Sequence, residues 1–118
     1  MNSEDRPNPK LGALIALALN FKEIREPLVG YIYLLRQGDI FKIGRSKNPS
    51  ERRRVHNNTS PVEVSLEHKL HVIDMESAES WLHRRFKQKL IKNEWFRLTP
   101  EDVAWVKQLR DGFYNEST

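Results

Sequence analysis

The stretch that decides the fold is GYIYLLRQGDIFKIGR, residues 30–45. Its two ends, residues 30–36 and 40–45, are rich in β-branched and aromatic side chains. Between them lies Gln37-Gly38-Asp39, which is typical of a tight turn. The stretch therefore predicts a β-hairpin.

Alternation along the hairpin separates an apolar face from a polar one. A loop of even length pairs residues whose numbers sum to an odd value, so one face carries Ile32, Leu34, Phe41 and Ile43. The other face carries Tyr31, Tyr33, Lys42 and Gly44. With Gln37-Gly38 as the two-residue turn, Tyr33 lies opposite Lys42. We expect a core on the first face and a phenol beside an ammonium on the second, with Gly44 clearing space at the strand end.

Signals for further elements flank the hairpin on both sides. Good helix formers at helical spacing predict a helix over residues 10–25. Asn48-Pro49 is a cap followed by a first helical residue, so a second helix carries Arg52 and His56. Residues 62–72 alternate and then become irregular near His68, which predicts a third strand with a bulge.

The second half of the chain reads as two helices and a short extended piece. Asp74 caps a long helix to about Leu90, with an apolar stripe at Met75, Ala78, Leu82, Phe86 and Leu90. Residues 93–96 are extended, and residues 100–111 form a last helix that starts after Thr99. We predict an α+β fold with a small three-stranded, mainly antiparallel sheet flanked by helices. A flexible tail, residues 1–9, precedes a single domain, residues 10–112, whose motif core spans 30–98.

Length and composition limit the class of protein. The 118 residues suit one domain, and 20 Lys and Arg against 16 Asp and Glu give a net charge of +4, which favours a polyanionic partner. Cysteine is absent, so disulfides and thiolate metal sites are excluded. The apolar run 11–19 is much shorter than the roughly 20 residues of a membrane span, and acidic residues before it argue against a secretion signal. We expect a cytoplasmic protein without a membrane partner.

Several side chains suit attack on a phosphodiester. Such hydrolysis needs a positioned water, a proton acceptor, and cations for the charge that develops on phosphorus. Tyr33 or Lys42 can orient or deprotonate water, and Arg52 can clamp phosphate oxygens with its planar fork. His56 lies one helical turn after Arg52 and can touch a phosphate or relay a proton, while Glu79 can hold a divalent cation.

Each of these residues also has a purely structural interpretation. A strand tyrosine usually packs in the core, and a helical carboxylate such as Glu79 usually pairs with a neighbour, here His83. His68, His71 and His83 lack convincing metal-ligand spacing, and we interpret them as structural. Only the combination indicates a nuclease.

In order and spacing, the motifs resemble the GIY-YIG nuclease superfamily. The resemblance rests on Tyr31-Ile32-Tyr33, Lys42-Ile43-Gly44, the following Arg52 and His56, Ala78-Glu79 with Leu82-His83 and Phe86, and Glu94-Trp95-Phe96. It covers about residues 30–98 and is closest to a phage and bacterial branch whose second motif begins with Lys.

The resemblance implies roles for these positions. Tyr33 orients or deprotonates water, Arg52 stabilises the transition state, His56 is accessory, and Glu79 holds one Mg²⁺ or Mn²⁺ ion. Lys42 replaces a second tyrosine, so the base stays open; Tyr33 is the better candidate, with Lys42 lowering its pKa or contacting the phosphate. Tyr31, Gly44 and Asn93 are accessory positions. The implied activity is metal-dependent DNA hydrolysis that leaves a 5′ phosphate and a 3′ hydroxyl.

Basic side chains beside these motifs suit contact with the DNA backbone. They are Arg45, Lys47, Arg53, Arg54, Arg84, Arg85, Lys87 and Lys89. A monomer and a homodimer both fit, and a partner that adds specificity is compatible with the small size. Two rival functions stay open. One is a nucleic-acid-binding module of the same fold without turnover; the other is a regulatory subunit whose Trp81, Trp95 and Trp105 mark an interface, although core tryptophans are favoured.

Overall fold

The computed structural model describes residues 26–115. The predicted helix at 10–25 and the predicted tail at 1–9 lie outside the described residues. No helix within residues 26–115 is long and apolar enough to cross a membrane.

A five-stranded antiparallel sheet forms the centre of the described region, in the order β3-β1-β2-β5-β4. Its strands are β1 (Gly30–Gln37), β2 (Ile40–Ser46), β3 (Ser65–Val72), β4 (Leu90–Lys92) and β5 (Trp95–Arg97). The α+β class and the flanking helices are confirmed, but the predicted count of three strands is wrong. The two additional strands are three residues each, too short for an alternation to be recognised; β5 overlaps the extended piece predicted at 93–96, but its pairing in the sheet was not predicted.

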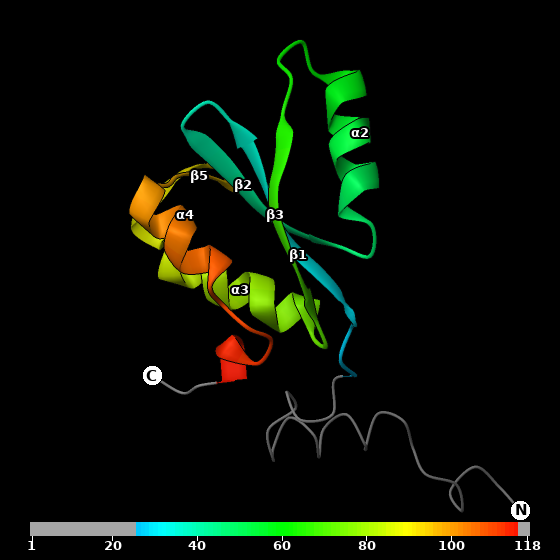
Figure 1. Ribbon diagram of the computed structural model, residues 1–118, viewed down its shortest axis with the longest axis vertical. Helices are drawn as coiled ribbons and strands as arrows, with labels where there is room; N and C mark the ends of the chain where they lie inside the picture. Colours follow the sequence, from blue (N-terminus) through cyan, green and yellow to red (C-terminus); the bar gives the residue numbers. More distant parts are fainter. Residues whose placement is uncertain (1–25, 116–118) are drawn as a thin grey trace, which may run out of the picture.

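Helices cover both faces of the sheet (Figure 1). Helix α2 (Pro49–Thr59) lies on one side, and α3 (Met75–Arg85) and α4 (Pro100–Lys107) lie on the other. The 3₁₀ turns are η3 (Lys87–Lys89) and η4 (Phe113–Asn115).

The predicted helix starts are confirmed by their caps. Asn48, Asp74 and Thr99 each accept a backbone N–H with the side chain. The predicted end of the third helix is wrong, because α3 stops at Arg85 and the chain turns through η3 into β4. Leu90, assigned to the buried stripe, is therefore 47 % exposed.

Two apolar clusters occupy the two faces of the sheet, whereas the alternation predicted an apolar core on one face only. The larger contains Ile32, Leu34, Phe41 and Ile43 and packs against α3 and α4 through Ala78, Leu82, Val103 and Val106. The smaller lies on the α2 side and contains Tyr33, Leu35 and Val64, with Leu66 and Trp95 against them.

The hairpin register differs from the predicted one by two residues. The turn residues are Gly38 and Asp39, and Tyr33 lies opposite Gly44 while Lys42 lies opposite Leu35. Gly38 has φ of 63°, so the glycine is needed at the first central position of the turn. A shift of two keeps every side chain on its predicted face, but it separates Tyr33 from Lys42.

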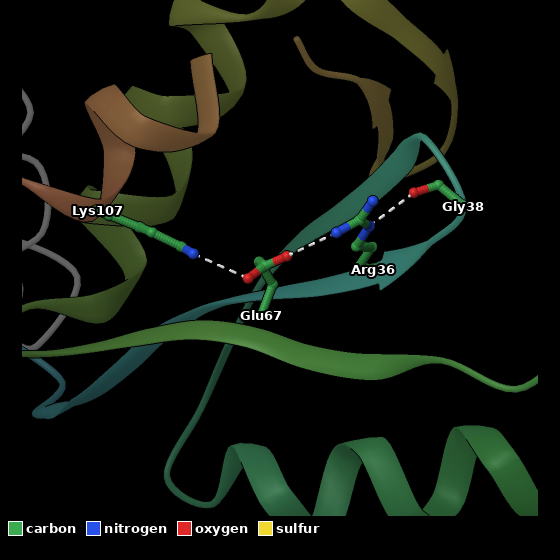
Figure 2. A network of polar contacts seen from close by, with 4 residues as sticks. All are labelled: Arg36, Gly38, Glu67 and Lys107. Atoms are coloured by element: carbon green, nitrogen blue, oxygen red, sulfur yellow. Dashed lines mark hydrogen bonds and ion pairs between the residues drawn. The ribbon is translucent and has the colours of Figure 1, made fainter. Parts of the chain in front are cut away.

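The predicted bulge in β3 is also confirmed. Pairing jumps from Leu34 with His68 to Leu35 with Leu66, so Glu67 is the extra residue. Its two carboxylate oxygens accept hydrogen bonds from Lys107 Nζ of α4 at 2.9 Å and from Arg36 Nη1 of β1 at 3.3 Å (Figure 2). The bulge thus ties the hairpin and α4 to the third strand.

Candidate active site

Tyr33 lies at the centre of the candidate site, on the α2 side of β1. It is 1 % exposed, and opposite it β2 has no side chain, because the residue there is Gly44. A Cβ at Gly44 would lie 2.4 Å from both Cζ and the hydroxyl oxygen of Tyr33. The glycine therefore makes the space that the phenol occupies.

Arg52 is the cation that contacts this phenol. Helix α2 begins at Pro49 and presents Arg52 in its first turn, close enough to the Tyr33 hydroxyl for its guanidinium to lower the pKa of the phenol. Burial raises the pKa of Tyr33 above its ordinary 10.0, and Arg52 partly opposes that rise. The predicted neighbour Lys42 lies diagonally across the pair from Tyr33 and not directly opposite it, with Nζ 3.7 Å from Glu94 Oε2.

Glu79 is a buried carboxylate on α3, only 9 % exposed. Its Oε1 accepts a hydrogen bond of 3.0 Å from Arg45 Nη1, at the end of β2. Burial raises the pKa of Glu79, the neighbouring Glu94 carboxylate raises it further, and His83 and Arg45 lower it. A buried carboxylate whose ionisation a neighbouring carboxylate opposes favours a cation beside it.

Glu79, His83 and Glu94 could hold such an ion. Each offers one ligand atom, and the three atoms lie within 4.8 Å of one another. The set combines two carboxylate oxygens with an imidazole nitrogen, which suits Mn²⁺ and its neighbours as well as Mg²⁺.

Backbone contacts orient two of these three ligands. His83 Nε2 lies 2.8 Å from the Ile43 carbonyl oxygen, so a neutral ring that donates there keeps a lone pair on Nδ1. Metal-binding histidines commonly use their other nitrogen in this way. The Glu94 carbonyl accepts the Ile43 N–H at 3.0 Å, which attaches the turn before β5 to the same position of β2.

His83 and Glu94 are the site residues that the sequence did not reveal. His83 was interpreted as structural, although its separation of four residues from Glu79 places both on one side of α3. Glu94 was noted only within its Glu-Trp-Phe motif, and its approach to Glu79 depends on the unpredicted β4–β5 turn.

His56 borders the site from α2, one turn after Arg52. Its ring centroid lies 5.6 Å from that of Trp95, and its Nε2 is buried without a hydrogen-bond partner among the described residues. Asn93, the remaining accessory candidate, has φ of 55° in the turn before Glu94. We therefore see a conformational role for Asn93 that the sequence did not suggest.

Several of the cations predicted to contact DNA already interact with other side chains of the protein. Arg45, Arg54 and Lys89 form ion pairs with Glu79, Glu51 and Asp102, and Arg85 lies over the Trp105 ring at 4.3 Å. Four others form no ion pair within the described residues and are exposed: Lys47, Arg53, Arg84 and Lys87. These four are the cations most available to an external anion.

The tryptophans pack against the two apolar clusters. Trp81 and Trp105 stack with centroids 6.1 Å apart against the larger one, and Trp95 packs against the smaller one. This packing agrees with the favoured interpretation of the three residues as core tryptophans.

Residues 30–111 match the T5orf172 domain, and the chain belongs to this family. T5orf172 is a phage-associated domain with nuclease-like associations. The match begins with β1 and extends past α4, so it includes every residue of the site described above. No curated protein and no solved structure matches the sequence.

Proposed function

We propose that this protein is a metal-dependent endonuclease of the GIY-YIG type that hydrolyses DNA phosphodiester bonds. The observation that carries the proposal is the convergence of a buried phenol, a guanidinium and a carboxylate–imidazole–carboxylate set. Arg52 lowers the pKa of the Tyr33 phenol, and the charges of Glu94 and Glu79 raise it, so all three groups lie near it. These groups come from four separate segments of the chain. A structural role for any one of them would not require all of them to meet.

The chain would hold the ion through Glu79, His83 and Glu94. When bound, a divalent cation there would polarise a phosphoryl oxygen and offset the charge that develops on it. Arg45 pairs with Glu79 and Lys42 pairs with Glu94. Both cations therefore lie beside the proposed ion site, where they could neutralise the negative charge of a phosphate. With an ion held by the carboxylates, the Arg45 and Lys42 side chains would be available to a phosphate.

Arg52 and Tyr33 act on the reacting phosphate and the water. The Arg52 fork donates hydrogen bonds to two non-bridging oxygens and stabilises the transition state more than the ground state. The Tyr33 oxygen, as phenolate, accepts one proton from the attacking water. The water oxygen bonds to phosphorus, the bond from phosphorus to the 3′ oxygen breaks, and that oxygen takes a proton from solvent. The products carry a 5′ phosphate and a 3′ hydroxyl.

Positive charge around the site would hold the DNA backbone. Lys47 follows β2, Arg53 lies next to Arg52 on α2, and Arg84 and Lys87 lie at and beyond the end of the Glu79 helix. Such contacts bind phosphates without reading bases.

A nucleic-acid-binding module without turnover is the second candidate. One observation favours it: both carboxylates of the ligand set are already paired with cations, Glu79 with Arg45 and Glu94 with Lys42. Such a module binds DNA but has no use for a divalent ion.

The experiment combines cleavage with metal binding. End-labelled DNA is incubated with the wild type, Arg52→Ala and the matched control Arg54→Ala, whose residue pairs with Glu51 on the same helix. Loss of about 100-fold or more in rate for Arg52→Ala alone supports the nuclease. Calorimetric titration with Mn²⁺ should show one site in the wild type and none in His83→Ala. DNA binding without cleavage, and without metal binding, would support the module instead.

A further inference from the structure

Beside the candidate site, three exposed or half-exposed side chains form a strip on the α2 side of the sheet: Tyr31, Lys69 and His71. Tyr31 lies opposite His71, and Tyr33 lies opposite Lys69, in the β1–β3 register. Tyr31 and Tyr33 are two residues apart on one strand, so their Cα atoms are about 7 Å apart. The strip therefore lies directly beside Tyr33.

The Tyr31 ring is not used by the protein core. Neither apolar cluster of the described residues includes it, whereas Tyr33 belongs to one of them. Its contacts are with the rest of the strip: the His71 ring meets it edge-on at 5.0 Å, and Lys69 Nζ lies 5.3 Å from its centroid. The Tyr31 ring is half-exposed, and its electron-rich face attracts the Lys69 ammonium.

This combination fits a nucleobase and its phosphate better than other ligands. Every base has a π face that stacks on tyrosine or histidine, and the flexible Lys69 ammonium can leave the ring for a phosphate oxygen. A base inside a duplex has both faces covered by its neighbours. Only a base outside the stack can lie on Tyr31.

We propose that Tyr31, His71 and Lys69 form a stacking platform for an unpaired nucleobase next to the scissile phosphate. The inference rests on the proposed nuclease function and names its substrate class: DNA with nucleotides outside the duplex, such as a bulge or a single-stranded branch. The platform selects structure rather than sequence, because stacking tolerates every base.

The test measures binding in EDTA, where metal-dependent cutting is absent. Two DNA hairpins differ only in one bulged nucleotide, 2-aminopurine, whose fluorescence falls when it stacks. We expect the full-length wild type to bind the bulged hairpin at least fivefold more tightly than the paired one and to quench the bulged base. Tyr31→Leu should lose the preference and the quenching, whereas Tyr31→Phe should keep both.

The controls separate this inference from the proposed function. His71→Leu makes the same test at an exposed position if Tyr31→Leu does not fold, as judged by circular dichroism. An unchanged preference in the folded variant, or none in the wild type, would overturn the platform even if the protein cuts DNA. Retained preference for the bulge in a wild type that never cuts would refute the nuclease and leave the platform standing.

Discussion

At the scale of single residues, the site depends on an absent side chain. Gly44 leaves the volume that the Tyr33 phenol fills, and a Cβ there would meet the ring at 2.4 Å. Gly44→Ala should therefore displace the phenol and lower the free energy of unfolding by about 1–3 kcal/mol, as overpacking does. Chemical denaturation of the wild type and the variant measures this change.

A double-mutant cycle assigns that cost to the ring. In a Tyr33→Ala background the Cβ has no phenol to meet, so Gly44→Ala should cost less than half as much. Equal costs in both backgrounds would show that the glycine serves the backbone and not the phenol.

The pH dependence of cleavage follows from the buried phenol. Because burial raises the pKa of Tyr33 above 10.0, the hydroxyl is neutral near pH 7 and the phenolate is the minor form. The cleavage rate should therefore rise about tenfold per pH unit from pH 7 to beyond 10, as the phenolate fraction rises. Initial rates across that range measure it, with Tyr33→Phe as the variant that lacks the rise. A flat profile would exclude the phenolate as base.

The face on which each hairpin residue lies was easier to predict than the residue that lies opposite it. The face of each hairpin residue depends only on even or odd position, and it was right for Tyr33, Lys42 and Gly44. The opposing residue depends on which two residues form the turn, and that depends on the positive φ of Gly38. The prediction that Tyr33 lies directly opposite Lys42 was wrong for this reason.

At the scale of elements, one asparagine fastens the helix that carries Arg52. Asn57 Oδ1 accepts the Val64 N–H at 2.7 Å, and its Nδ2 donates to the Val64 carbonyl at 3.2 Å. Asn57→Ala leaves both groups of a buried residue unpaired and should cost about 1–3 kcal/mol of unfolding free energy. Cleavage should also slow, because α2 loses its anchor to the strand that follows.

The neighbouring Asn58 gives a matched control. It is exposed and lies on the same helix, so Asn58→Ala should change the unfolding free energy by less than about 0.5 kcal/mol. Equal melting temperatures for the two variants would contradict the anchoring role of Asn57.

Elements with local signals were predictable, and those that depend on distant partners were not. The three described helices start at predicted caps, since a cap needs only its own next three residues. Strands β4 and β5 have three residues each and exist because β5 adds to the edge of β2. No local pattern specifies that pairing, so the end of α3 was misplaced as well.

At the scale of the whole molecule, DNA binding should depend on salt through a few free cations. Each phosphate contact contributes about 0.9 to the slope of log affinity against log salt. Lys47→Gln or Arg53→Gln should thus reduce the slope by about one, measured by anisotropy over a salt series. Arg97→Gln is the control, because Arg97 is already paired with Asp39 at 2.6 Å; an equal reduction there would contradict the assignment.

The complete ligand set also arises only from the whole fold. Glu79 was predicted as a ligand. His83 lies four residues later on the same helix and was interpreted as structural, whereas Glu94 is brought to Glu79 by the β4–β5 turn. Their spacing in sequence resembles no common metal motif. Sequence reasoning therefore found one candidate ligand of three.

We propose that this assembly of residues cuts DNA with a divalent ion. Relaxation of supercoiled plasmid in Mg²⁺ or Mn²⁺ tests it most directly, with the wild type and Glu79→Gln side by side. We expect nicked plasmid from the wild type only, and none in EDTA. Equal nicking by Glu79→Gln, or intact plasmid with the wild type in both metals, would contradict it.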